Sequence, residues 1–296
     1  MRNNIYLLLI VSNALYACSP SRGDAREASG ANSAVVALVD APDRFFRRDS
    51  VSIRYRVIGD GPPVLLLHGY TDRVEMWAGT ADSLAADFQV IVPDLRGHGL
   101  STKFDEPGSY GRQMVDDLTG LLDHLGVRAA HVIGYSMGGV LAAHLALDNP
   151  PRALSTTLVA GSFWGRDSAG AARVIEPYLA PIERGEGLGP FFRYILPTWP
   201  DSAIDAIVPT LQASNDSLSL VASLRGFLGL MLDTTDFARA RTPALAIVSV
   251  KDPLLEYSRF VARAWPGLRL VELPRGDHAD IFLAPELVTE FRKLAR

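Results

Sequence analysis

The chain contains very little cysteine and no excess of positive charge. Its single cysteine, Cys18, in 296 residues excludes an intramolecular disulfide and a zinc site of the multi-cysteine type. Its 29 basic and 33 acidic side chains give a net charge of -4, which argues against a nucleic-acid surface because such a surface needs clustered positive charge. The fold must therefore be held together by burial alone.

The features of disordered and repetitive proteins are also lacking. Hydrophobic residues make up 48% of the chain, which is ordinary for a globular protein, and the charged fraction of 21% is not high. No internal repeat is evident. The length suits one large or two small domains, and an α/β domain with an inserted subdomain fits it well.

Residues 1–17 look like a secretory signal. Arg2 supplies one positive charge, and the apolar stretch 5–11 that follows is too short to span a bilayer comfortably. We therefore predict a signal peptide over residues 1–17. Cleavage without lipid attachment, after Ala14 or Ala17, and an uncleaved anchor are the alternatives.

The lone cysteine follows this segment directly. Leu15-Tyr16-Ala17-Cys18 resembles a bacterial lipobox, in which the signal is cut before Cys and the new amino-terminal Cys carries lipid. Ser19 resembles the residue at that place in proteins sorted to the outer membrane. The resemblance implies lipid attachment at Cys18 and an exported protein of the bacterial periplasm, anchored to the outer membrane. Residues 18–34 are predicted to form a flexible tether.

Strand patterns alternate with helix patterns after the tether. Residues 44–48 and 51–58 alternate apolar with charged residues, so Arg54 and Arg56 are expected to share one solvated face. A continuous apolar run predicts a buried strand at 64–67, and further buried strands are predicted at 90–92, 130–133, 155–159, 244–250 and 268–273. Helical spacing is found at 77–86, 115–125 and 140–147. This order predicts a mostly parallel sheet covered on both faces, with sites at the carboxyl ends of its strands.

The stretch 161–236 interrupts the alternation. It is rich in helical and aromatic residues, contains no convincing buried strand, and is too long for a simple loop. We predict an inserted helical cap here, between core segments 35–160 and 237–296. Its aromatic residues suggest a small to medium apolar acyl or aryl substrate, although aromatics at helical spacing are more often the core of the cap itself.

A candidate nucleophile lies directly after the strand 130–133. Gly134-Tyr135-Ser136-Met137-Gly138 is a G-x-S-x-G elbow, in which the chain turns so sharply from strand to helix that glycine is needed on both sides of the serine. The turn pushes the Ser136 hydroxyl into solvent and aims the first N–H groups of the helix at whatever that hydroxyl attacks.

A serine hydroxyl needs a base to remove its proton and a third group to orient that base. His278 lies in the turn after the last predicted strand, and no other histidine follows Ser136 outside the helix of the elbow. Asp252, just past its own strand, can accept the ring N–H of His278. Three other acids compete for this role: Asp277, Asp280 and Asp167.

An oxyanion formed at this site needs two N–H donors set in place beforehand. The backbone N–H of Met137 follows from the elbow, and that of Tyr70 follows from its place after the strand 64–67. His68 is expected to be a structural histidine, bonded within its own loop, and His98 a turn residue. The chemistry needs no metal and no organic cofactor.

These motifs together resemble the α/β-hydrolase superfamily. The matching residues are His68-Gly69-Tyr70, Asp94-Leu95-Arg96-Gly97-His98-Gly99, the elbow at Ser136, Asp252 and His278. The resemblance implies an α/β-hydrolase fold, and it is greatest to capped serine esterases and carbon-carbon hydrolases. The family often has a Gly-x-x-Asp turn at the acid, and Ser249 stands at the place of that glycine. Epoxide hydrolases and haloalkane dehalogenases of the fold use Asp as nucleophile, so Ser136 argues against both activities.

The sequence therefore predicts a serine hydrolase that cleaves a carboxylic ester or related acyl bond of a small molecule through an acyl-enzyme. A carbon-carbon bond hydrolase using the same triad is the alternative within enzymes. A ligand-binding protein on the same fold, with turnover too slow to matter, is the alternative outside them.

Overall fold

The computed structural model describes residues 36–161 and 168–296. These residues build an eight-stranded sheet with the order β1-β2-β4-β3-β5-β6-β7-β8. Strand β2 pairs antiparallel with β1 and β4, and the other neighbouring strands are parallel. The strands are β1 (Arg44–Arg48), β2 (Val51–Ile58), β3 (Pro63–Leu67), β4 (Gln89–Pro93), β5 (Ala130–Tyr135), β6 (Ala153–Val159), β7 (Ala244–Ser249) and β8 (Arg269–Leu273). The predicted mostly parallel sheet is confirmed.

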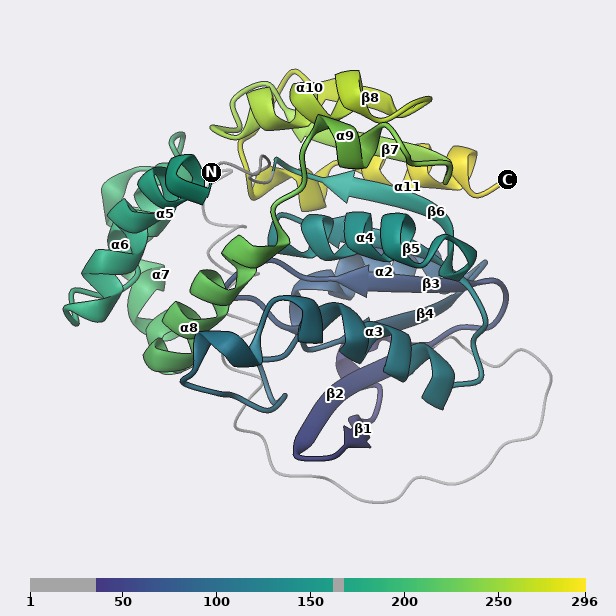
Figure 1. Ribbon diagram of the computed structural model, residues 1–296, viewed down its shortest axis with the longest axis horizontal. Helices are drawn as coiled ribbons and strands as arrows, with labels where there is room; N and C mark the ends of the chain where they lie inside the picture. Colours follow the sequence, from purple (N-terminus) through teal and green to yellow (C-terminus); the bar gives the residue numbers. More distant parts are fainter. Residues whose placement is uncertain (1–35, 162–167) are drawn as a thin grey trace.

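Helices cover both faces of this sheet (Figure 1). They are α2 (Ala78–Leu84), α3 (Arg112–His124), α4 (Met137–Asp148), α10 (Leu255–Ala264) and α11 (Pro285–Leu294). Residues of β3 divide between two hydrophobic clusters, Leu65 and Leu67 with α3, α4 and α10, and Val64 and Leu66 with α2 and α11. A buried parallel strand has apolar neighbours on both faces, which explains its unbroken apolar sequence.

The described residues between β6 and β7 form helices and no strand. These are α5 (Ser168–Glu183), α6 (Gly189–Ile195), α7 (Asp201–Ala213), α8 (Ser217–Phe227) and α9 (Thr234–Phe237). Figure 1 shows α5 to α8 gathered at one end of the sheet, the end toward which the parallel strands point. The segment predicted as a cap therefore stands over the carboxyl ends of the strands.

Short 3-10 helices fill several of the connections. They are η2 (Leu38–Asp40), η3 (Val74–Trp77), η4 (Pro107–Ser109), η5 (Pro150–Arg152), η6 (Leu228–Leu230) and η7 (Asp280–Leu283). The predicted helix 77–86 is in fact η3 followed by α2. Helices α3 and α4 begin three residues before their predicted starts. Each added turn holds one buried methionine, Met114 or Met137, beside two polar or glycine residues that weaken the apolar spacing.

Some of the sequence predictions concern residues that the structure does not describe. The signal segment 1–17, Cys18 with the tether, and Asp167 lie outside the described residues. Within the described ranges, no helix combines the length and the apolar character needed to cross a membrane.

The solvated face predicted for Arg54 is wrong. Strand β2 lies inside the sheet, and the Arg54 side chain is only 3% exposed. Its guanidinium pairs with Asp43 at 2.7 Å, Glu75 at 2.6 Å and Asp94 at 3.1 Å. Burial opposes its charge, but these carboxylates outweigh burial and raise the pKa of Arg54. Arg56 shares the face as predicted and also bonds Asp43.

His68 joins the loops that follow β3 and β4, and the structural role predicted for it is confirmed. Its Nδ1–H donates to the Gly69 carbonyl at 2.8 Å, and its Nε2 accepts from the Leu95 N–H at 2.8 Å. Only a neutral ring can do both, because one nitrogen must lack a proton to accept. Complete burial lowers the pKa of His68 to about 4.

We expect Arg54→Met to lower the free energy of unfolding by about 3–5 kcal/mol, because the change leaves the buried carboxylate of Asp94 without its cation. Urea unfolding followed by circular dichroism measures the loss. The exposed Arg47 of β1 provides a matched control, since Arg47→Met should change stability by less than about 0.5 kcal/mol. A loss below 1 kcal/mol for Arg54→Met would contradict the structure.

His68 should also make the fold sensitive to acid. The unfolded ring has a pKa of about 6.5 and the folded ring one of about 4, so unfolding takes up a proton between these values. Stability from this group is therefore complete above pH 6.5 and falls as the pH drops, by about 2 kcal/mol between pH 7 and pH 5. Unfolding of wild type and His68→Gln at both pH values tests this. Equal losses in the two proteins would refute it.

Candidate active site

Ser136 sits in a backbone conformation that its two glycine neighbours make possible. It links β5 to α4 with φ of 49° and ψ of -115°. A Cβ on Gly134 would lie 2.2 Å from the Gly138 carbonyl oxygen, and one on Gly138 would lie 2.4 Å from the Leu67 oxygen. Real Cβ atoms do not approach so closely, so the sequence must have glycine at both positions. The predicted sharp turn at Ser136 is present.

Two backbone N–H groups beside this turn are free. Met137 is the first residue of α4, where the helix offers its N–H no acceptor. Tyr70 lies in the loop after β3 and lines the same cavity as Ser136. Within the described part of the chain, neither N–H has a hydrogen-bond acceptor. Both are therefore available to an oxygen atom bound in front of Ser136.

Asp252 and His278 form a buried pair. The His278 Nδ1–H donates to Asp252 Oδ2 at 2.9 Å, and the two side chains are 2% and 0% exposed. Asp252 also accepts from the backbone N–H groups of Gly161 at 3.0 Å and Leu254 at 2.8 Å. Burial opposes its charge, but the charge and hydrogen bond of His278 and these two donors outweigh burial and lower the pKa of Asp252.

The competing acids have other partners. Asp277 accepts from the Thr198 hydroxyl at 2.5 Å, in the connection between α6 and α7, and Asp280 accepts from the Asp277 N–H at 2.9 Å. Ser249, which stands where a glycine was expected, donates its hydroxyl toward the Arg275 and Gly276 carbonyls. This contact joins the loop of Asp252 to the loop of His278, so the departure from the family pattern adds a tie between the two residues.

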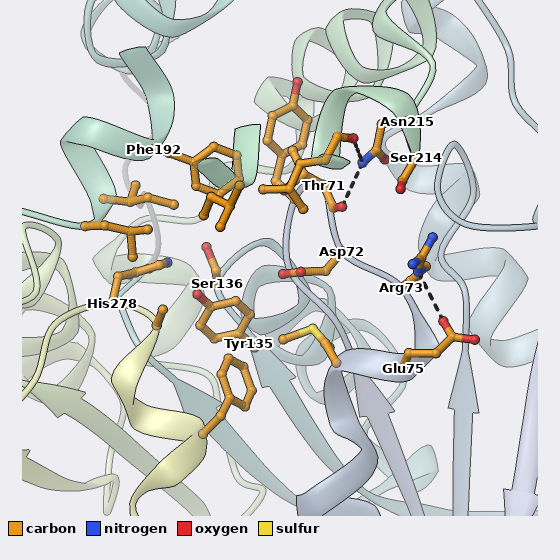
Figure 2. Close-up of a pocket in the computed structure, with 18 of the residues that line it drawn as sticks. Thr71, Asp72, Arg73, Glu75, Tyr135, Ser136, Phe192, Ser214, Asn215 and His278 are labelled. Atoms are coloured by element: carbon orange, nitrogen blue, oxygen red, sulfur yellow. Dashed lines mark hydrogen bonds and ion pairs between the residues drawn. The ribbon is translucent and has the colours of Figure 1, made fainter. Parts of the chain in front are cut away.

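Ser136 and His278 face each other across one cavity of about 300 Å³ (Figure 2). Figure 2 shows a ring nitrogen of His278 directed toward the Ser136 hydroxyl. Among the described residues no hydrogen bond joins the two side chains, and such bonds often tighten only when substrate is bound. The hydroxyl of Ser136 and the imidazole of His278 therefore line the same cavity, and the carboxylate of Asp252 lies behind the imidazole.

Apolar side chains from α6, α7 and the connection between them form one wall of the cavity. They are Phe191, Phe192, Ile195, Leu196, Trp199, Ile207 and Leu211. Other aromatics of this segment pack among themselves, as Tyr178 does on Tyr194, and Phe227 lies in the hydrophobic core. The aromatic residues thus divide between the cavity wall and the packing of the helices. Phe163 and Trp164 lie outside the described residues.

The cavity lining also includes polar residues to which the sequence analysis gave no role, among them Asp72 and Asn215. Asn215 follows α7, and its amide donates to the Thr71 carbonyl at 3.0 Å. Burial raises the pKa of Asp72 to about 7. The place of Asp72 just beyond a strand end was a usable signal in the sequence, whereas the contact of Asn215 joins segments 144 residues apart. In the described ranges, no group of three His, Cys, Asp or Glu side chains is placed to hold a metal ion.

Comparisons with known proteins agree with this architecture. Residues 62–182 match the model of the alpha/beta hydrolase fold family. A protein named as the carbamate hydrolase RutD, from Azorhizobium caulinodans, is 29% identical over 80% of this chain and 91% of its own length. The acetyltransferase component of the acetoin cleaving system from Cupriavidus necator is 40% identical, but the match covers 38% of this chain and only 30% of that protein.

A solved structure extends the likeness along most of the chain. The thermophilic esterase from Thermogutta terrifontis is 26% identical, with a TM-score of 0.70 over 86% of this chain and 100% of the esterase. A TM-score of 0.70 over this coverage shows that the two proteins share the same overall fold. The chain therefore has the alpha/beta hydrolase fold, and the family model and the solved neighbour support its place in the alpha/beta hydrolase superfamily.

Proposed function

We propose that the chain is a serine hydrolase that cleaves a carboxylic ester or a related acyl bond through an acyl-enzyme. The observation that carries the proposal is the position of Ser136, at a sharp turn between two free N–H groups and across one cavity from the bonded pair of Asp252 and His278. Acyl transfer by serine needs a hydroxyl, a base and a group that orients the base. All three types of group are present here.

In the first half of the reaction, Ser136 Oγ attacks the acyl carbon while His278 takes the hydroxyl proton. The carbonyl electrons move onto oxygen, and the N–H groups of Tyr70 and Met137 bind the resulting oxyanion. Each such donor contributes about 10²–10³-fold in rate. When the intermediate collapses, the bond to the leaving alcohol breaks and His278 gives its proton to that oxygen.

In the second half, His278 takes a proton from water, and the hydroxide formed attacks the acyl-enzyme. Collapse releases the carboxylic acid and returns the proton to Ser136. Asp252 holds the ring with its proton on Nδ1, so Nε2 is the nitrogen left to act as base. The lowered pKa of Asp252 keeps its carboxylate charged, which stabilises the imidazolium formed in each half.

The cavity supports a small to medium substrate with an apolar part. Its volume of about 300 Å³ is at the lower end of ligand pockets, and the wall from α6 and α7 is aliphatic and aromatic. The likeness to the Thermogutta terrifontis esterase favours an ester as the bond cleaved. The likeness to RutD makes a carbamate the first related acyl bond to compare with it.

We expect Ser136→Ala to lower the turnover of p-nitrophenyl butyrate at least about 10³-fold, because the attacking atom is lost. A fluorophosphonate probe should label the wild type and not this variant. Ser214→Ala is a matched control, since Ser214 also lines the cavity but donates its hydroxyl to the Thr210 carbonyl. Its turnover and labelling should equal those of the wild type. Wild-type protein that is unlabelled and inactive on acetyl, butyryl, octanoyl and carbamoyl p-nitrophenyl compounds would end the proposal.

Asp252→Asn should lower kcat on the same ester by about 10⁴-fold, because an amide cannot hold His278 in the required tautomer or stabilise its charged form. Asp280→Asn is the control, with an expected loss below about tenfold, since Asp280 bonds a backbone N–H instead of the ring. Initial rates at saturating substrate give both values. A larger loss for Asp280→Asn than for Asp252→Asn would show that Asp252 is not the acid that orients His278.

A further inference from the structure

The loop after β3 carries a carboxyl group into the cavity beside Ser136. Asp72 lines the cavity, and Figure 2 shows its carboxyl pointing across the space toward Ser136 and Tyr135. A Cβ on Gly69 would lie 3.3 Å from Asp72 Oδ2 and 2.7 Å from the Tyr135 ring, which places the carboxyl over the loop that holds Tyr70. The reacting end of the cavity therefore has an acidic group that the serine mechanism does not use.

The backbone around Asp72 is held in an unusual conformation. Thr71 has φ of 69°, a region that a β-branched residue rarely adopts. The Asp72 N–H closes a turn onto the Gly69 carbonyl at 3.3 Å, and Asn215 holds the Thr71 carbonyl from the far side at 3.0 Å. Strain of this kind persists where the surrounding structure fixes it and is found most often at functional sites.

The carboxyl group itself has no protein partner. In the described residues, Asp72 forms no side-chain hydrogen bond and no ion pair. The neighbouring Arg73 pairs with Glu75 instead, at 3.4 Å, as the dashed line in Figure 2 marks. Burial raises the pKa of Asp72 to about 7, although His278 and Arg73 act to lower it. The side chain is half-buried, and an acceptor partly withdrawn from water without a donor is costly. A ligand that brings a donor removes this cost.

We propose that Asp72 is a specificity-determining residue that accepts a hydrogen bond from a hydroxyl or N–H group of the substrate, close to the scissile carbonyl. This inference rests on the proposed serine hydrolase function. The apolar remainder of the substrate then lies against the wall formed by α6 and α7, while Ser136 attacks the carbonyl between the two. The favoured substrates are acyl compounds that carry a hydrogen-bond donor next to the reacting group, such as hydroxyacyl esters.

Matched pairs of esters test the assignment. The probes are p-nitrophenyl butyrate and its 2-hydroxy and 3-hydroxy derivatives, which differ only in the donor. For the wild type, kcat/KM should be about tenfold to hundredfold higher for at least one hydroxy ester than for the plain ester, the usual range for a buried hydrogen bond to substrate. Equal values for all three esters in the wild type would overturn the proposal without any variant.

Variants then locate the preference in the carboxyl group. Asp72→Ala should bring the ratio between hydroxy and plain ester close to one, whereas Asp72→Asn, whose amide oxygen still accepts, should keep most of it. Asp105→Ala, which removes an exposed carboxylate, should leave the ratio unchanged. Fluorophosphonate labelling of Ser136 and the melting temperature report whether each variant keeps its site and fold.

The outcomes separate this inference from the function on which it rests. A labelled, folded Asp72→Ala protein that keeps the wild-type ratio overturns the role of Asp72 and leaves the serine hydrolase intact. If Asp72→Ala instead lowers kcat/KM equally on all three esters, so that the ratio is unchanged, Asp72 has a structural role and the proposed specificity role is also overturned. A wild type that is neither labelled nor active on any ester shows instead that the proposed function has failed.

Discussion

The close contact of Gly134, Gly138 and the end of β3 is the constraint on which the site depends. Because glycine has no Cβ, β5, α4 and the loop after β3 approach one another closely enough to place Ser136 between the N–H groups of Met137 and Tyr70. The positive φ of Ser136 follows from the same approach. Geometry that would be strained in an open loop is fixed here by packing on three sides.

The remaining groups, Asp252 and His278, follow strands further along the sheet. Buried hydrogen bonds between the loops that end these strands hold the two residues in place. Gly161, which follows β6, donates to Asp252, which follows β7. Ser249 then ties the loop of Asp252 to the loop of His278 after β8. The chain of contacts crosses three neighbouring parallel strands, so the order of the sheet decides which loops can cooperate.

Local patterns were sufficient to predict the parts of the site that depend on strand ends. The elbow at Ser136 and the acid after β7 each follow an apolar run that had to be a buried strand. The histidine follows β8, an edge strand of which only Leu273 is buried, so the strand was predicted correctly but its burial was not. Arg54 was misread because alternation shows which residues share a face and not what covers that face; the covering groups Asp94 and Glu75 come from other loops. Asn215 was missed for the same reason, since its partner Thr71 belongs to a different segment.

The buried carboxylates of the fold differ from Asp72 in that each has a partner. Asp94 and Asp117 pair with arginines, Asp252 with His278, and Asp277 with Thr198. A folding chain gains stability by giving each of these groups a partner, because an unpaired buried charge is expensive. Asp72, half-buried in the cavity wall that faces Ser136, has no such partner among the described residues. Since folding alone gives no reason to keep a carboxyl there, the reason is to be sought in what enters the cavity.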